Sequence, residues 1–253
     1  MGADYAGTVL AKGPVGYWRL GEATGPTAAD LSGKGHDGTY LATPTYGQPG
    51  AVAGDPDAAL KCDGHLYVEV PSSADFSQPT SGQGLTVETW LRPDLLDFPG
   101  QTDPSGDQYA HWLGKGDAGQ YEWGFRFYPL SSSRPNRVSA YIWTPGKVEG
   151  AGAYFGDVLT AGEWIHVVAC YDPGDLHTKG AGVRIYKNGQ LRPPSPGALY
   201  SSYNIVPTPG AAPLRLGTRD LRSFLFGALD EVAIYPRVLT AQEVLDNYNA
   251  GTS

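Results

Sequence analysis

The sequence of 253 residues has few of the features that mark common protein classes. It contains two cysteines, Cys62 and Cys170, and no Cys-x-x-Cys spacing for a zinc site. No stretch approaches the roughly 20 apolar residues of a membrane helix, so we expect no membrane insertion. The first residues lack the charged start and apolar core of a secretory signal peptide. Without such a signal, two buried free thiols are favoured over a disulfide.

Basic residues are also scarce. The chain has 18 Lys and Arg against 26 Asp and Glu, a formal net charge of -8. Binding to a phosphate backbone requires clustered Lys and Arg, and the sequence has no basic run of that kind. The composition therefore predicts no nucleic-acid partner.

Glycine and proline, by contrast, are abundant, with 35 Gly and 21 Pro. Both weaken helix interiors, so the composition excludes a mainly helical protein. Alternation with period two, typical of half-buried strands, occurs in segments 66–70, 85–91, 121–128, 137–144, 164–171, 183–187 and 229–235. Asn188-Gly189 is a two-residue hairpin turn. About a dozen strands with this spacing predict one domain over 1–253, an all-β antiparallel sandwich of two sheets.

Two short helices are predicted at the ends of the chain. The first begins near Asp4 and stops at Gly13-Pro14. The second spans 240–249, where Thr240 and Glu243 form a capping box and Gly251 ends the helix. Two long loops, 94–109 and 192–213, are where binding or assembly contacts are expected.

Several segments resemble the motifs of laminin-G-like, concanavalin A-like jelly-roll domains and follow their order. They are 15–22 (VGYWRLGE), 30–39 (DLSGKGHDGT), 59–64 (ALKCDG), 85–93 (LTVETWLRP), 164–169 (WIHVVA), 183–189 (VRIYKNG) and 227–235 with Leu239-Thr240. The resemblance covers the chain from near residue 5 to near residue 250. It implies a two-sheet jelly roll with Trp18, Trp90 and Trp164 in the core and His166 as a hydrogen-bonded core histidine.

The same resemblance leaves several functions open, because such domains serve as carbohydrate-binding modules, adhesion domains, glycosidase appendages and virion surface proteins. Residues 5–20 are also similar to the start of many bacteriophage tail and head-surface proteins. We therefore predict a non-catalytic module on a virion surface, as a head decoration or tail protein. Its expected partners are other virion proteins and host glycans. The alternatives are a carbohydrate-binding module of a bacterial surface or secreted protein, and a glycoside hydrolase.

Catalytic residues are not predicted. A glycosidase needs two carboxylates a few ångströms apart, and related glucanases carry them as E-x-D-x-E on one strand. Asp230 and Glu231 are adjacent, so alternation should point them to opposite faces of the sheet. The Gly-x-Gly-x-x-Gly matches at 33–38 and 114–119 open no helix and are expected to be turns rather than nucleotide sites.

A structural Ca²⁺ ion is the one cofactor predicted. Asp30 opens a glycine-rich loop, and Asp230 lies on the last strand of the family pattern. The family often pairs its N- and C-terminal strands, so the resemblance implies that Asp30 and Asp230 meet and share the ion. The alternative is an Asx-turn at Asp30 and backbone hydrogen bonds to Asp230.

Trp143 and Trp112 are the predicted ligand-binding residues. Sugar binding uses exposed aromatic faces beside polar groups, and Trp143 ends a strand just before Pro145-Gly146, near a rim. The alternative for both is core or rim packing. Trp123 is predicted to be in the core because period-two alternation places four aromatic residues on one strand face, namely Tyr121, Trp123, Phe125 and Phe127.

Overall fold

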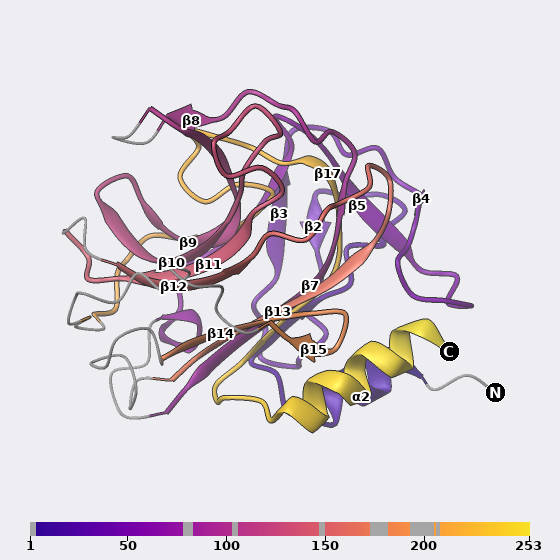
Figure 1. The fold of residues 1–253 in the computed structure, drawn as a ribbon. Coiled ribbons are helices and arrows are strands. Elements are labelled where there is room, and N and C mark those ends of the chain that lie inside the picture. The colour runs from indigo at the N-terminus through magenta and orange to yellow at the C-terminus, as the bar shows by residue number, and fades with distance from the viewer. Residues whose placement is uncertain are drawn as a thin grey trace.

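The computed structural model describes residues 4–77, 83–102, 106–146, 150–172, 182–192, 205 and 208–253. Within these residues, two antiparallel sheets of eight and nine strands pack face to face, and two short α-helices lie near the ends of the chain (Figure 1). The predicted all-β sandwich is confirmed. The segment 193–204, which is most of the second predicted long loop, lies outside the described residues.

The eight-stranded sheet has the order β15-β14-β13-β7-β17-β5-β4, and β1 pairs with β17 beside this path. Its strands are β1 (Gly16–Trp18), β4 (Gln48–Pro49), β5 (Ala58–Asp63), β7 (Leu85–Pro93), β13 (Ile165–Tyr171), β14 (Val183–Lys187), β15 (Gln190–Leu191) and β17 (Phe226–Tyr235). The Asn188-Gly189 hairpin joins β14 to β15 with positive φ at both residues, as predicted.

The nine-stranded sheet has the order β12-β11-β10-β9-β16-β6-β3-β2, and β8 pairs with β9. Its strands are β2 (Thr27–Ala28), β3 (Gly38–Leu41), β6 (Tyr67–Val70), β8 (Gln101–Thr102), β9 (Gln108–Asp117), β10 (Gln120–Phe127), β11 (Val138–Trp143), β12 (Gly150–Phe155) and β16 (Leu214–Leu216). The glycine-rich segment 114–119, predicted as a turn, forms the end of β9 and its hairpin to β10.

The helices are α1 (Tyr5–Leu10), α2 (Ala241–Thr252) and the short 3₁₀ helix η1 (Ala74–Phe76). The Thr240–Glu243 capping box is confirmed, but α2 continues through Gly251. A Cβ on Gly251 would lie 2.6 Å from the Trp90 ring, so this glycine permits close packing instead of ending the helix. Among the described residues, none of the helices has the length and apolar character needed to span a bilayer.

The main core fills the space between the sheets, where Trp18 and Trp123 are fully buried. A second apolar cluster lies on the other side of the eight-stranded sheet, where α2 is drawn in Figure 1, and includes Trp90 at 3% exposure. The core position predicted for Trp164 is wrong. Trp164 precedes β13 and is only half-buried, with the Arg92 guanidinium 5.1 Å from its ring centroid.

Three register shifts interrupt the strand pairing, and two of these β-bulges change the alternation at candidate site residues. In β10 the register to β9 slips between Tyr121 and Trp123, and Tyr121 lies on the face opposite to the core, beside Trp143. In β17 the register to β7 slips after Asp230, and Glu231 has a φ of 55°. Asp230 and Glu231 therefore do not point to opposite faces, as a bulge locally disrupts the pleat.

The Glu88 carboxylate on β7 is fully buried and joins four other elements. Its Oε1 accepts hydrogen bonds from Tyr5 of α1 at 3.2 Å and from His166 of β13 at 2.8 Å. Its Oε2 accepts from Tyr235 of β17 at 2.8 Å and from Asn247 of α2 at 2.7 Å. His166 is thus the hydrogen-bonded interior histidine that was predicted. These bonds attach both terminal helices to the sheet.

Substitution of Glu88 by Gln should destabilise the fold. Burial alone raises the pKa of Glu88, but hydrogen bonds from His166, Tyr235 and Asn247 outweigh it and hold that pKa below its usual value. The stabilising effect is therefore present near neutral pH and is lost as pH falls through the lowered folded-state pKa. Urea unfolding at pH 7 should show that Glu88→Gln lowers the free energy of unfolding by about 3–5 kcal/mol. The difference in unfolding free energy between the variant and the parent should become smaller in acid.

The matched control is Glu69→Gln, whose carboxylate is 37% exposed and pairs with Arg215. The Glu69 carboxylate is partly solvated, and Arg215 keeps a second acid partner, Asp117, at 2.8 Å, so this variant should lose about 1 kcal/mol or less. Equal unfolding free energies for Glu88→Gln and the parent at pH 7 would contradict the role assigned to the Glu88 network.

Candidate functional site

The outer face of the nine-stranded sheet carries aromatic and guanidinium groups. Along β10 and β11, Phe125, Ala140 and Ile142 point into the main core, so their neighbours along each strand point outward. We call the resulting cluster the aromatic–arginine face, and its members are Tyr109, Tyr121, Arg126, Tyr141, Trp143 and Arg219. Arg219 comes from the segment after β16, and the other five come from β9, β10 and β11.

Glycines beneath these side chains let them lie flat on the sheet. A Cβ at Gly150 would lie 2.8 Å from the Trp143 ring, and one at Gly152 would lie 2.4 Å from the Tyr141 ring. A Cβ at Gly124 would similarly meet Arg219 Cδ at 3.0 Å. Contacts under about 3 Å are too close for a real side chain, so larger residues at Gly150 and Gly152 would displace the rings.

Both arginines lie over aromatic rings. The Arg126 guanidinium is 4.3 Å from the centroid of Tyr109, 4.7 Å from Tyr141 and 5.3 Å from Trp143. The Arg219 guanidinium is 3.5 Å from Tyr121 and 4.7 Å from Trp143. Each such cation–π contact contributes about 0.5–2 kcal/mol and fixes the orientation of the guanidinium plane.

A buried polar network lies behind the arginines. Arg126 Nε donates to His111 Nε2 at 3.0 Å, which assigns the imidazole proton to Nδ1, 3.8 Å from Asp220 Oδ2. Gln101 donates to Asp220 Oδ1 at 2.8 Å. Burial and the charges of Arg219 and Arg126 hold the pKa of His111 well below its usual value. His111 is therefore neutral and does not add to the positive charge.

The charges of this face do not balance. Among the described residues, Asp220 is the only acid that forms an ion pair with either arginine, through Arg219 Nη2 at 3.2 Å. The Nε and Nη1 atoms of Arg219 are buried and make no hydrogen bond. Two guanidinium groups thus share one carboxylate.

Neighbouring buried charges on the same sheet are paired. Lys115 of β9 contacts Glu122 of β10 at 2.5 Å, and Arg215 of β16 pairs with Glu69 and Asp117 at 2.9 and 2.8 Å. Lys115 and Arg215 thus each have an acid partner, which the described residues do not provide for Arg126.

The structure separates the two predicted ligand-binding tryptophans. Trp112 is fully buried in the main core, so it has no open face for a sugar and does not fit the predicted role. Trp143 belongs to the aromatic–arginine face but is 4% exposed and stacks on Tyr141 at 5.4 Å. The half-buried members are Tyr121 and Arg126, which the sequence analysis did not select.

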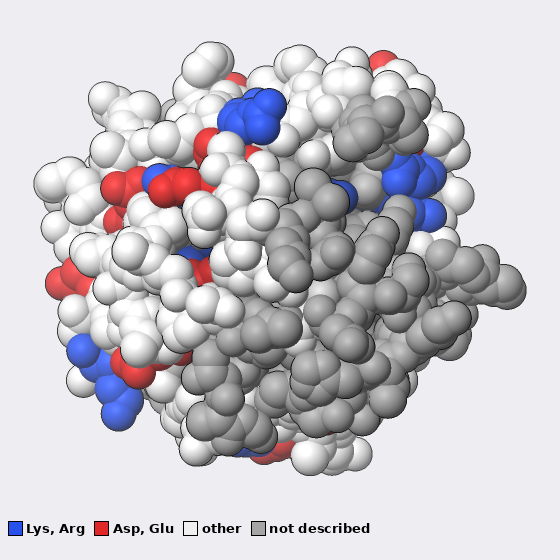
Figure 2. Space-filling model, turned by 90° about the vertical axis from the view of Figure 1, so that its left-hand side faces the viewer, with Lys and Arg blue, Asp and Glu red and all other residues white. Residues whose placement is uncertain are grey.

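Figure 2 shows the molecule from the side on which β9–β12 are drawn in Figure 1. Acidic and basic side chains are interspersed over the described part of this view, which contains no continuous basic surface of the size that nucleic-acid binding requires.

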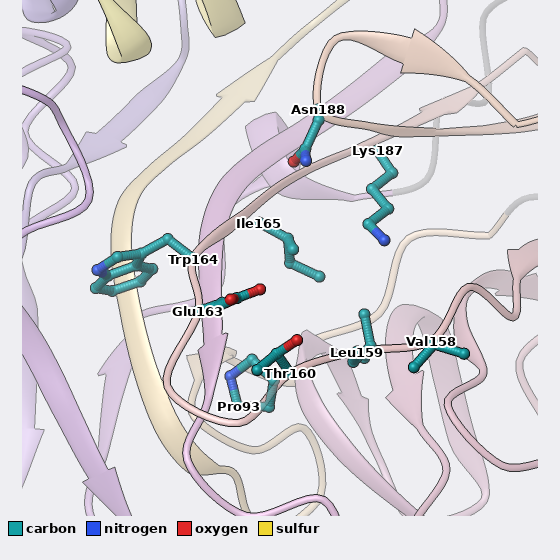
Figure 3. Close-up of a pocket in the computed structure, with 9 residues that line it drawn as sticks. All are labelled: Pro93, Val158, Leu159, Thr160, Glu163, Trp164, Ile165, Lys187 and Asn188. Atoms are coloured by element: carbon teal, nitrogen blue, oxygen red, sulfur yellow. The ribbon is translucent and has the colours of Figure 1, made fainter.

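A second candidate is a shallow pocket beside the start of β13, with a volume of about 110 Å³ (Figure 3). Glu163 and Lys187 lie on opposite sides of it, and Lys187 Nζ is already paired with Asp157 at 3.2 Å. The remaining lining residues are Pro93, Val158, Leu159, Thr160, Trp164, Ile165 and Asn188. Ligand pockets usually enclose about 300–1,000 Å³, so this one is too small for an oligosaccharide.

The predicted metal ligands lie in different surroundings. The Asp30 carboxylate accepts four hydrogen bonds, from the backbone of Tyr17, Ser32 and His36 and from the Ser32 hydroxyl, at 2.8–2.9 Å. This is the Asx-turn alternative for Asp30. These donors occupy both of its oxygens, which argues against a role as a metal ligand.

Asp230 instead belongs to an acidic cluster with Asp57 and Glu231, whose oxygens lie within 4.8 Å of one another. Asp230 Oδ2 accepts from the Ala51 amide at 2.7 Å, and Oδ1 is buried without a partner. Arg19 is the cation of this cluster, at 2.9 Å from Glu231 and 3.2 Å from Asp57. Burial and the neighbouring Glu231 raise the pKa of Asp230 well above its usual value.

Comparison with known proteins assigns the family. A family model described as concanavalin A-like lectin/glucanases superfamily matches residues 63–245. The chain belongs to this superfamily. No curated protein sequence matches the chain.

Two solved structures illustrate which proteins share this fold. The binding domain of botulinum neurotoxin DC, in complex with rat synaptotagmin II, has a TM-score of 0.65 and 10% identity, covering 96% of this chain and 52% of its own. Domain 4 of AbnA, a GH43 extracellular arabinanase from Geobacillus stearothermophilus, in complex with arabinotriose, has a TM-score of 0.60 and 18% identity, covering 93% and 98%. The chain thus spans about half the length of the neurotoxin binding domains. At these identities the likeness shows the fold.

Proposed function

We propose that this chain is a non-catalytic carbohydrate-binding module whose ligand lies against the aromatic–arginine face. The observation that carries the proposal is the convergence of four aromatic rings and two guanidinium groups on one outer sheet face. The apolar faces of sugar rings pack on aromatic side chains, and their hydroxyls accept hydrogen bonds from guanidinium groups. The arabinotriose complex of the arabinanase domain supports a sugar ligand for this fold.

The half-buried members, Tyr121 and Arg126, form the contact surface of this proposed site. Trp143 lies beneath them and supports both, since its ring is 5.6 Å from Tyr121 and 5.3 Å from the Arg126 guanidinium. The predicted role of Trp143 as a stacking platform is thus replaced by a supporting one.

The arrangement of carboxylates favours binding over catalysis. A glycosidase exposes an acid and a nucleophile or base to its substrate at about 5–9.5 Å from each other. Asp230 and Glu231 lie close together, but they are 1% and 0% exposed and their cluster includes the Arg19 cation. On the aromatic–arginine face, the Asp220 carboxylate already pairs with Arg219.

The location of the module is a separate part of the proposal. The resemblance of residues 5–20 to bacteriophage tail and head-surface proteins supports a virion surface, with other virion proteins as partners. The alternative is a bacterial surface or secreted protein, as the extracellular arabinanase domain illustrates for the fold. Mass spectrometry of purified particles decides between them.

Substitution of Tyr121 by Ala tests the proposed face. A glycan array identifies the ligand, and calorimetry then measures its Kd. Loss of a central aromatic contact usually costs more than about 1.4 kcal/mol, or tenfold in Kd, so Tyr121→Ala should weaken binding at least tenfold. Tyr46→Ala is the matched control, because Tyr46 is also half-buried but packs on Tyr40. Unchanged binding in Tyr121→Ala, or loss of binding in Trp164→Ala, would contradict the assignment.

A structural Ca²⁺ ion at Asp57, Asp230 and Glu231 is a further part of the proposal. Ca²⁺ takes several carboxylate and carbonyl oxygens, and a buried Asp230 oxygen without a partner fits such a site. When bound, the ion would add positive charge to a cluster in which Arg19 faces three acids.

Thermal melts with and without chelator test this ion. Occupancy at 100 times its dissociation constant adds about 2.7 kcal/mol of stability, so chelator should lower the Tm of the parent by several degrees. Asp30→Asn should keep this response, since Asp30 lies in its own turn, whereas Asp230→Asn should lose it. An identical melt of the parent with and without chelator would contradict the proposed ion. Asp230 would then be held by the hydrogen bond from the Ala51 amide.

A further inference from the structure

We infer that the aromatic–arginine face selects acidic saccharides, in which a carboxylate or sulfate group pairs with Arg126. The inference rests on the proposed function and names the class of sugar. It follows from the charge balance at this face, together with the position of Arg126 at the solvent boundary.

Arg126 is the arginine that a ligand can reach. It is half-buried, and its Nε is used by His111. No acid among the described residues forms an ion pair with it, while the aromatic rings of Tyr109, Tyr141 and Trp143 hold the guanidinium in place. A planar, fixed guanidinium is suited to bidentate recognition of carboxylate or sulfate oxygens.

The buried Arg219 guanidinium adds to the attraction between the aromatic–arginine face and an anionic ligand. It is fully buried, shares its one carboxylate partner with Gln101, and keeps two nitrogens without a hydrogen bond. Charges in such a water-poor, ring-lined environment interact more strongly than charges in water. Counted over the described residues, the site therefore lacks one negative charge, in a protein whose formal net charge is -8. A ligand that brings this charge completes the network, and a neutral sugar does not.

The contrast with Arg92 supports this assignment. Arg92 also lies over an aromatic ring, that of Trp164, but its Nε pairs with Asp94 at 2.8 Å. At Arg92 a carboxylate thus accompanies the arginine–aromatic contact, whereas the described residues place none at Arg126.

Calorimetry with three probes tests the inference: an oligogalacturonate, its methyl ester, which has the same sugar without the charge, and a sulfated galactan oligosaccharide. The parent protein should bind at least one acidic probe ten or more times more tightly than the neutral ester, because only the acid forms charge-assisted hydrogen bonds with the guanidinium. The preferred acidic probe distinguishes carboxylate from sulfate recognition. Raising the salt concentration should reduce the preference only partly, since a half-buried pair is screened less than an exposed one.

Arg126→Gln should abolish the difference between the acidic and neutral probes, and Arg92→Gln should leave it unchanged. The comparison of acid and ester in the parent needs no variant, so it stands even if Arg126→Gln fails to fold. Equal or tighter binding of the ester by the parent would overturn the inference while leaving a sugar-binding module intact. Failure of all three probes and of a broad glycan array would overturn the proposed function as well.

Discussion

The buried carboxylate of Glu88 is the interaction on which the arrangement of the chain's ends depends. It accepts hydrogen bonds from Tyr5, His166, Tyr235 and Asn247, which belong to α1, β13, β17 and α2. An isolated charge at this depth would be costly, because burial removes it from water. Four donors offset that cost only when both helices are docked on the eight-stranded sheet. The charge therefore couples the first and last residues of the fold to its central strands.

The cost of burying a charge without a partner also distinguishes the candidate sites from the rest of the fold. Other buried charges in the described residues have partners, as Glu88 has its four donors and Lys115 has Glu122. Two clusters lack this balance. The cluster around Asp230 has more acids than Arg19 can balance, and the aromatic–arginine face has more guanidinium groups than Asp220 can balance. The divalent cation proposed for the first cluster and the anionic sugar proposed for the second would each supply charge of the sign that is lacking there.

Much of the fold could be predicted because it depends on local signals. Period-two alternation, the Asn188-Gly189 turn and the Thr240–Glu243 capping box are each specified by residues close in sequence. The two β-bulges are not specified in this way. One moves Tyr121 to the outer face, and the other brings Glu231 beside Asp230. A single extra residue reverses the strand parity, so the alternation rule assigned both side chains to the wrong face.

Only part of the candidate site could be predicted from the sequence. Trp143 was selected for its place at the end of a strand, but no local pattern shows that Arg219 lies 4.7 Å from its ring, because the two residues are distant in sequence. One signal was available: the alternating glycines Gly150 and Gly152 in a strand-like segment indicate that large side chains from a neighbouring strand lie across them. Trp164 was assigned to the core because the family pattern placed it inside the strand. In the structure, β13 begins one residue later, at Ile165.

The most direct test of the account is a nuclear magnetic resonance titration of the six tryptophan indole N–H groups with the glycan that binds. These groups report on distinct places, with Trp143 at the aromatic–arginine face, Trp164 beside the small pocket and Trp112 and Trp123 in the core. The Trp143 signal should shift in proportion to binding while the Trp164 signal stays in place. A shift of Trp164 with Trp143 unchanged would move the binding site to the pocket beside β13 and contradict the central claim.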